Sequence, residues 1–311
     1  MMDYWVAGRR LLLLLILVGS SCRPDDVSAE RGRDLPVQVV QAGEIALHYV
    51  SAGHGAPVVL VPGGLEDYRA WTAQLGPLAK EHFRAIAYSR RYDFPNRNLP
   101  RNIASYSAKV DAKDLARLLE KLKLGPVHLV GHSYGGLGAL FFATEHPELV
   151  RSLTLSEPPL PAWVKKETEG AALAQVFWEA FWRPLGRALA QGAKEKALSI
   201  AGRYFTGGAN VPADVEAVLT PNLREWEVLT RSTDAFPVPS DDSLRRIKAP
   251  VLLLTGDHSL PLLQRSVREI GNRLPGSRQV TIRNAAHDMW REKPSDCGAA
   301  LRHFLHTVAA H

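Results

Sequence analysis

The chain contains the stretch Val-His-Leu-Val-Gly-His-Ser-Tyr-Gly-Gly at residues 127–136. The first four residues of this stretch predict a buried strand, and the residues that follow it predict a helix. At the turn between them, Gly131 and Gly135 flank Ser133 in the order Gly-x-Ser-x-Gly. The strained turn lifts the Ser133 hydroxyl off the sheet, and only residues as small as glycine let strand and helix approach so closely around it. In this context the motif predicts a nucleophilic serine.

Strands and helices alternate on both sides of this stretch. Runs of β-branched and apolar residues predict further strands at residues 37–40, 45–50, 58–61, 83–88, 150–155, 251–254 and 279–282. Helices are predicted at residues 108–122, 134–146 and 295–308. Continuously apolar strands are typical of a parallel sheet covered on both faces, and the alternation implies right-handed crossovers. The sequence therefore predicts the α/β class with a doubly wound, mostly parallel sheet.

Residues 158–241 interrupt this pattern. They begin with Pro-Pro-Leu-Pro, contain helical stretches without a convincing strand, and hold four of the seven tryptophans. We therefore expect a helical lid at 158–241, inserted into one core made of residues 37–157 and 242–311. Its tryptophans Trp163, Trp178 and Trp182 are candidates to line an apolar substrate pocket. Packing of the lid onto the core is the alternative role for these aromatic side chains.

A nucleophilic serine needs a general base and hydrogen-bond donors for the oxyanion that forms when it attacks an acyl carbon. Gly63 and Gly64 follow the strand predicted at 58–61. An oxyanion hole pairs the residue after the nucleophile with a residue of this earlier loop. We therefore predict that the backbone N–H groups of Gly64 and Tyr134 form the hole.

Three motifs resemble the α/β-hydrolase superfamily: Val61-Pro62-Gly63-Gly64, the Gly-x-Ser-x-Gly stretch, and Asn284-Ala285-Ala286-His287 with the following Glu292-Lys293-Pro294. The resemblance covers nearly all of the chain after residue 36 and implies an α/β-hydrolase fold. It places the general base at His287, on the loop after the last strand and after Ser133 in chain order. Pro62 departs from the pattern, because the family's loop usually starts with His-Gly.

The acid that would orient His287 has two candidates. Most members of the family place it three residues after the Gly that ends the penultimate strand, where this chain has Ser259, and a serine cannot stabilise an imidazolium by charge. Glu157 is favoured, because one subgroup of haloalkane dehalogenases and the zearalenone-type lactonases take their acid from the end of the corresponding strand. Asp257, directly after Gly256, is the alternative. Both lie at the carboxyl edge of the predicted sheet, where active sites of such folds occur.

The resemblance also narrows the reaction. Family members that open epoxides or remove halides attack with a carboxylate, whereas Ser133 implies an acyl-enzyme that water, activated by His287, then hydrolyses. We expect hydrolysis of a small carboxylic ester or lactone. Perhydrolysis or C–C bond hydrolysis by the same triad is one alternative, and a non-enzymatic binding protein on a hydrolase scaffold is another. No HExxH, paired-His or GxGxxG pattern occurs, so we expect no metal and no cofactor.

The N-terminal residues predict export. Arg9 and Arg10 precede the apolar run at residues 11–18, and small residues lead from there to Cys22, which is the order of a secretory signal. The run is too short to span a bilayer. We expect a signal peptide at 1–21 and a polar tether at 22–36, in an exported bacterial protein that is periplasmic or attached to the membrane by a lipid on Cys22. Ordinary cleavage and a retained apolar anchor are the alternatives.

Composition excludes several other classes. Of the 311 residues, 46% are apolar and 23% charged, which is typical of a globular protein. Lys and Arg exceed Asp and Glu by 38 to 32, giving a net charge of +6, but no run of five basic residues occurs, so we expect no nucleic-acid partner. The two cysteines, Cys22 and Cys297, are too few for a disulfide framework or a thiolate metal site. The sequence does not indicate an oligomeric state.

Overall fold

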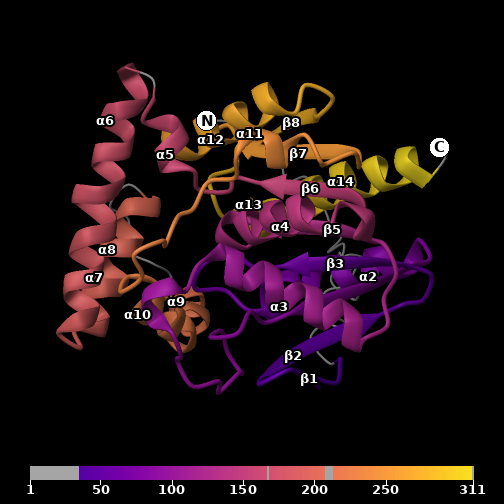
Figure 1. Ribbon diagram of the computed structural model, residues 1–311, viewed down its shortest axis with the longest axis horizontal. Coiled ribbons are helices and arrows are strands. Elements are labelled where there is room, and N and C mark those ends of the chain that lie inside the picture. Colours follow the sequence, from indigo (N-terminus) through magenta and orange to yellow (C-terminus); the bar gives the residue numbers. More distant parts are fainter. Residues whose placement is uncertain (1–34, 167, 207–212, 310–311) are drawn as a thin grey trace, which may run out of the picture.

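The computed structural model describes residues 35–166, 168–206 and 213–309. Its centre is an eight-stranded sheet in the order β1-β2-β4-β3-β5-β6-β7-β8 (Figure 1). The strands are β1 Gln38–Ala42, β2 Ile45–Ala52, β3 Ala56–Val61, β4 Phe83–Tyr88, β5 Val127–His132, β6 Val150–Ser156, β7 Val251–Gly256 and β8 Arg278–Ile282. The β1–β2 and β2–β4 pairs are antiparallel, and all other neighbours are parallel. The predicted doubly wound, mostly parallel sheet is confirmed.

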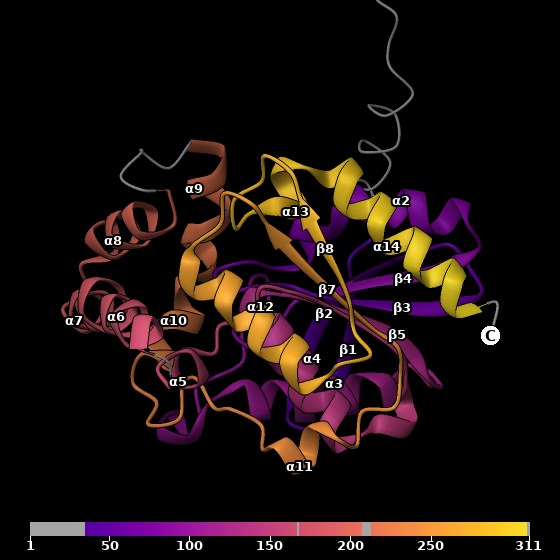
Figure 2. The ribbon, with the colours of Figure 1, turned by 90° about the horizontal axis from the view of Figure 1, so that it is seen from above.

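Helices cover both faces of the sheet (Figure 2). One face packs against α2 (Thr72–Lys80) and α14 (Pro294–Ala309), and the other against α3 (Ala108–Lys121), α4 (Ser133–Glu145) and α12 (Pro261–Arg273). Strand β3 explains this double burial, because its alternate residues point to opposite faces and all four of residues 58–61 are apolar and buried. Two short helices, α11 (Asp241–Leu244) and α13 (Met289–Glu292), precede β7 and α14.

Between β6 and β7 the chain leaves the sheet and forms a group of helices. These are α5 Pro161–Val164, α6 Thr168–Val176, the π-helical segment Phe177–Trp182, α7 Arg183–Ala190, α8 Lys194–Thr206, α9 Ala213–Leu219 and α10 Leu223–Leu229. The described part of residues 158–241 contains no strand. Figures 1 and 2 place α6 to α10 together on one side of the molecule. We refer to this group, α5 to α10, as the lid.

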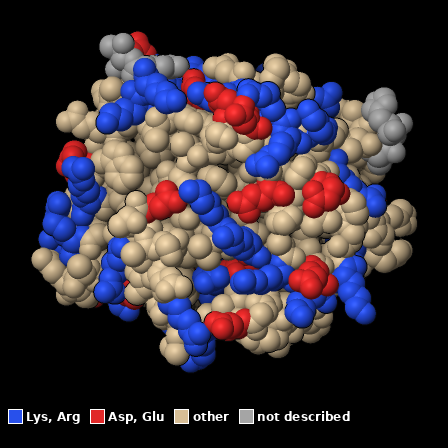
Figure 3. Space-filling view, in the orientation of Figure 1, with Lys and Arg blue, Asp and Glu red and all other residues tan. Residues whose placement is uncertain are grey.

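The predictions for the N-terminus lie outside the described residues. The expected signal peptide at 1–21, Cys22 and all but the last two residues of the expected tether fall within residues 1–34. In the described ranges, no helix is long and apolar enough to cross a membrane. On the face drawn in Figure 3, basic and acidic side chains are interspersed.

Candidate active site

Ser133 lies at the sharp turn between β5 and α4. Its φ of 49° is in the left-handed region, which a non-glycine residue rarely adopts. The flanking glycines allow this turn because there is no space for a side chain at either position. A Cβ at Gly131 would lie 2.7 Å from the Gly136 Cα, and one at Gly135 would lie 2.1 Å from the Pro62 carbonyl oxygen. The turn is therefore locked against both α4 and the loop after β3.

His287 lies on the loop between β8 and α13 and links Ser133 to a carboxylate. Its Nε2 is 2.9 Å from the Ser133 Oγ, and its Nδ1 is 2.7 Å from the Glu157 Oε2. The Phe205 ring stacks on the imidazole, with 5.3 Å between centroids and 13° between planes. Because Nδ1–H can donate to the carboxylate, Nε2 is left to accept the Ser133 proton.

Glu157 follows β6 and is completely buried, with a left-handed φ of 50°. Besides His287, three donors reach its carboxylate: Thr255 Oγ1 at 2.8 Å, Gly256 N at 2.9 Å and Ser259 Oγ at 2.6 Å. Such donors compensate a buried carboxylate for the water it has lost. Ser259, which stands at the position where the resemblance would place the acid, therefore donates a hydrogen bond to Glu157.

Asp257, the alternative acid, takes a different position. Its side chain is exposed, and its Oδ1 accepts a hydrogen bond from the Ala285 N–H at 3.2 Å. In the described part of the chain no hydrogen bond joins Asp257 to His287. Asp257 thus supports the loop that carries His287, whereas Glu157 contacts the imidazole itself.

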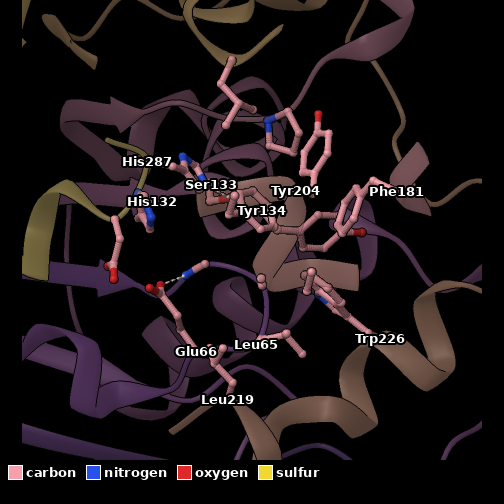
Figure 4. A pocket seen from close by; sticks show the side chains of 18 of the residues that line it. Leu65, Glu66, His132, Ser133, Tyr134, Phe181, Tyr204, Leu219, Trp226 and His287 are labelled. Atoms are coloured by element: carbon pink, nitrogen blue, oxygen red, sulfur yellow. Dashed lines mark hydrogen bonds between the residues drawn. The ribbon is translucent and has the colours of Figure 1, made fainter. Parts of the chain in front are cut away.

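The loop after β3 lies against the Ser133 turn. A Cβ at Gly63 would come within 3.1 Å of the Ser133 Cβ, and the Gly63 N–H is already occupied by the Glu66 Oε2 at 2.7 Å (Figure 4). The next N–H, that of Gly64, takes part in no hydrogen bond within the described ranges. Gly64 and Tyr134 both line the cavity in front of Ser133. Their positions suit an oxyanion hole formed by these two residues.

This cavity has a volume of about 180 Å³ and lies between the Ser133 turn and the lid. Seven aromatic residues from the region between β6 and β7 line it: Phe177, Phe181, Trp182, Tyr204, Phe205, Trp226 and Phe236. Figure 4 shows Phe181, Tyr204 and Trp226 on this side of the cavity. Aromatic rings pack edge to face or stacked throughout this wall, and the Phe181 and Tyr204 centroids are only 4.4 Å apart. An apolar wall of this kind favours an apolar ligand group.

The positions of the predicted substrate-binding tryptophans require a correction. Trp182 lines the cavity, but Trp163 and Trp178 do not. Trp163 packs beneath the Arg273 guanidinium, whose Cζ is 4.3 Å from the ring centroid. Trp178 lies behind the wall, with its ring edge against Phe236. Both side chains are therefore used to pack the lid.

Sequence reasoning missed much of this wall. Tyr204 and Phe205 come from α8, Trp226 from α10, and Phe236 from the segment that returns to the core. In the sequence these residues are distinguished only by being aromatic and lying between β6 and β7. The same is true of Trp163, which does not line the cavity.

The surroundings also shift the pKa of two ionisable groups near Ser133. Burial, together with the charge of His287, lowers the pKa of His132 well below its usual range, so this ring stays neutral 4.8 Å from the His287 ring. Burial and the nearby Asp288 raise the pKa of Glu66 to about 8. In the described ranges, no group of three or more His, Cys, Asp or Glu side chains is arranged to hold a metal ion.

Comparison with known proteins supports the fold. The family model for the alpha/beta hydrolase fold matches residues 56–197, from β3 into α8. Together with the sheet order and the turn at Ser133, this match shows that the chain has the α/β-hydrolase fold that its motifs predicted.

The individual curated relatives have low sequence identity to this chain. Bifunctional epoxide hydrolase 2 of Sus scrofa is 24% identical over 343 aligned positions, covering 98% of this chain and 60% of the relative. The chain spans 60% or less of the length of the first curated relatives that it matches.

Solved structures share the fold. A thermophilic esterase from Thermogutta terrifontis has a TM-score of 0.67 at 23% identity, covering 88% of this chain and 99% of that one. The enol-lactonase from Burkholderia xenovorans LB400 has a TM-score of 0.63 at 22% identity, covering 86% and 99%. At these identities the likeness extends to the fold alone.

Proposed function

We propose that the chain is a serine hydrolase that cleaves a carboxylic ester or lactone bearing an apolar group. One observation carries the proposal: Ser133 Oγ, the His287 imidazole and the Glu157 carboxylate form a continuous line with separations of 2.9 and 2.7 Å. These distances are those of a nucleophile hydrogen-bonded to its base and of a base oriented by an acid.

The reaction follows from this line. Ser133 Oγ attacks the acyl carbon while His287 Nε2 takes its proton, and Glu157 stabilises the imidazolium. The negative charge on the acyl oxygen is received by the N–H groups of Gly64 and Tyr134. His287 then gives the proton to the leaving alkoxide, which leaves an acyl-enzyme on Ser133. A water molecule activated by His287 releases the acid and restores the serine.

The nucleophile argues against epoxide opening, although a relative of this chain is named an epoxide hydrolase. Epoxide opening in this superfamily uses a carboxylate at the position of Ser133, because the covalent intermediate is then an ester that water can hydrolyse. Attack by a serine hydroxyl would leave an ether, which water cannot cleave under the same conditions. A hydroxyl paired with a base is instead suited to acyl transfer.

The cavity favours an apolar acyl or alcohol group of limited size. At about 180 Å³ it is comparable with dry protein cavities of roughly 150 Å³ that bind benzene. One aromatic ring or a short branched chain would fill it, in contact with Phe181, Tyr204 and Trp226.

A panel of p-nitrophenyl esters and lactones, together with a fluorophosphonate probe, tests the proposal. We expect ester hydrolysis by the wild type and covalent labelling at Ser133, identified by peptide mass spectrometry. The Ser133→Ala variant is the control and should show neither. A folded wild-type protein that neither hydrolyses any ester nor reacts with the probe would support a binding protein on a hydrolase scaffold instead.

We further propose that the protein is exported and carries a lipid on Cys22. The support is the sequence order of Arg9 and Arg10, an apolar run, small residues and Cys22. Intact-mass measurement on the membrane fraction should give a chain starting at Cys22 with an added acyl mass. A mature chain that starts elsewhere, or that lacks this mass, would refute the lipid attachment.

A further inference from the structure

Arg90 is buried behind the loop that carries the expected oxyanion donor. It follows β4, and its side chain is completely inaccessible to solvent. The guanidinium donates to two successive carbonyl oxygens of that loop, from Nη2 to Gly63 O at 2.8 Å and from Nε to Pro62 O at 3.1 Å. A buried charge is therefore directed at the backbone of the loop.

The bond to Gly63 O acts on the Gly64 N–H, because both groups belong to one peptide unit. A peptide unit is planar, so fixing the carbonyl direction also fixes the direction of the N–H on its other side. A charged donor on the carbonyl also polarises the amide, and hydrogen bonds in such a chain strengthen one another. Arg90 thus orients the Gly64 N–H and strengthens it as a donor.

The same guanidinium reaches the second expected oxyanion residue and the lid. Its Cζ lies 5.3 Å from the centroid of the Tyr134 ring. Its Nη1 donates to Glu225 of α10 at 2.6 Å, and the other oxygen of Glu225 accepts the Leu65 N–H at 3.1 Å. Leu65 has a left-handed φ of 60°, so Glu225 holds a strained residue directly after Gly64. Arg90 and Glu225 therefore hold the loop on both sides of the Gly64 N–H.

The charge needed for this role is retained. Burial lowers the pKa of Arg90, but the carboxylates of Asp93, Glu225 and Asp111 raise it, and the net shift is upward. Asp111 accepts from Nη1 at 3.0 Å and Asp93 lies 3.3 Å from Nε. At the position where the superfamily's loop usually has a histidine, Pro62 has no side-chain donor. Arg90, which follows β4 rather than β3, supplies a cationic donor to this loop instead.

We propose that Arg90 is a positioning residue for the oxyanion hole: its guanidinium orients and polarises the Gly63–Gly64 peptide so that the Gly64 N–H stabilises the transition state. The inference rests on the proposed acyl transfer at Ser133. Arg90 itself is shut off from the cavity by the loop and does not touch substrate.

The adjacent Arg91 offers a matched control. It forms a bidentate ion pair with Asp114 at 2.5 and 2.6 Å, is also largely buried, and has no hydrogen bond to the loop within the described residues. The experiment compares Arg90→Lys with Arg91→Lys on one p-nitrophenyl ester. Lysine keeps the charge but cannot donate to both carbonyls and to Glu225 with the arginine geometry.

We expect Arg90→Lys to lower kcat about 10- to 100-fold, less than or equal to the cost of deleting an oxyanion donor, with KM changed less than about threefold. The rate constant for fluorophosphonate labelling of Ser133 should fall in parallel, because the phosphonyl oxygen uses the same hole. Affinity for a boronic acid that mimics the tetrahedral state should fall likewise. Arg91→Lys should change each quantity less than about threefold.

Glu225→Gln gives a second test, which is used if Arg90→Lys does not fold as judged by circular dichroism. It keeps the shape of the side chain but loses the ion pair, and we expect kcat to fall about threefold to tenfold at unchanged KM. Equal kcat and labelling rates for the wild type and the folded Arg90 or Glu225 variant would overturn the inference. The same holds if Arg91→Lys loses as much kcat as Arg90→Lys. A wild type that Ser133-directed probes do not label would instead overturn the proposed function.

Discussion

Two regions meet at Ser133, and they are held together by different interactions. At the carboxyl edge of the sheet, Ser133 and Glu157 adopt left-handed backbone conformations and are fixed by hydrogen bonds of 2.6 to 2.9 Å. In the lid, aromatic rings pack with centroids 4.4 to 6.2 Å apart. A hydrogen-bond network is lost when a single donor or acceptor atom is removed. A packed aromatic wall tolerates substitution, and the shape of the cavity changes instead. We therefore expect the sheet edge to set the reaction and the lid to set the substrate.

The largest effect should come from the sheet edge. Ser133→Ala removes the proposed nucleophile, and we expect kcat to fall roughly 10⁶-fold for every ester tested, by analogy with known serine hydrolases. The free energy of unfolding should change by less than about 1 kcal/mol, because the methyl group occupies the same place. Steady-state kinetics and urea unfolding measure both. If the loss of kcat differed strongly from one ester to another, the lid would contribute to the reaction and the proposed division between sheet edge and lid would be wrong.

The lid should affect selectivity rather than rate. Phe181 lines the cavity. Phe181→Leu should therefore lower the ratio of kcat/KM for a p-nitrophenyl ester with an aromatic acyl group to kcat/KM for p-nitrophenyl acetate, by about fivefold to tenfold. Trp178→Leu is the matched control, because Trp178 lies in the same segment behind the wall. We expect it to leave this ratio within about twofold. If both variants shift the ratio equally, the cavity wall does not select the substrate.

The effect expected at Glu66, at the border of the two regions, is on stability rather than on rate or selectivity. Its pKa is raised from 4.5 to about 8, so between these values the folded protein holds a proton that the unfolded chain has lost. Stability therefore falls as pH rises through this window, by at most about 1.4 kcal/mol per pH unit.

Glu66→Gln should remove this slope. Urea unfolding at pH 5.5 and 7.5 should give a difference between variant and wild type that grows by roughly 2–3 kcal/mol in favour of the variant. If the free energies of unfolding of variant and wild type differ by the same amount at both pH values, Glu66 is ionised in the folded protein.

The sequence predicted the sheet edge better than the lid, and the comparison explains why. Gly131, Ser133 and Gly135 are close in the chain, so their spacing alone defines a strand, a turn and a helix. Glu157 was proposed as the acid because a serine, Ser259, occupies the position where the resemblance would place it. The cavity wall, by contrast, depends on which side of each lid helix faces Ser133, and this is set by packing between helices. For that reason Trp163 and Trp178 were wrong as cavity residues, and Tyr204 and Phe205 were missed.

The role of Arg90 was hidden for a similar reason. In the sequence it is one of two adjacent arginines, Arg90 and Arg91, after the strand predicted at 83–88. Its contacts with Gly63 O and Glu225 join segments 27 and 135 residues away in the chain. No local pattern reports such contacts.

A comparison of two variants tests the assignment of the acid to Glu157, at the end of β6. Glu157→Gln and Asp257→Asn are assayed on the same p-nitrophenyl ester. Because Glu157 contacts His287, we expect Glu157→Gln to lower kcat about 10³- to 10⁴-fold, as when the acid of a related triad becomes an amide. Asp257→Asn should cost less than about tenfold, since it alters only a loop contact. A loss of most of kcat in Asp257→Asn alone, with Glu157→Gln near wild type, would contradict the assignment.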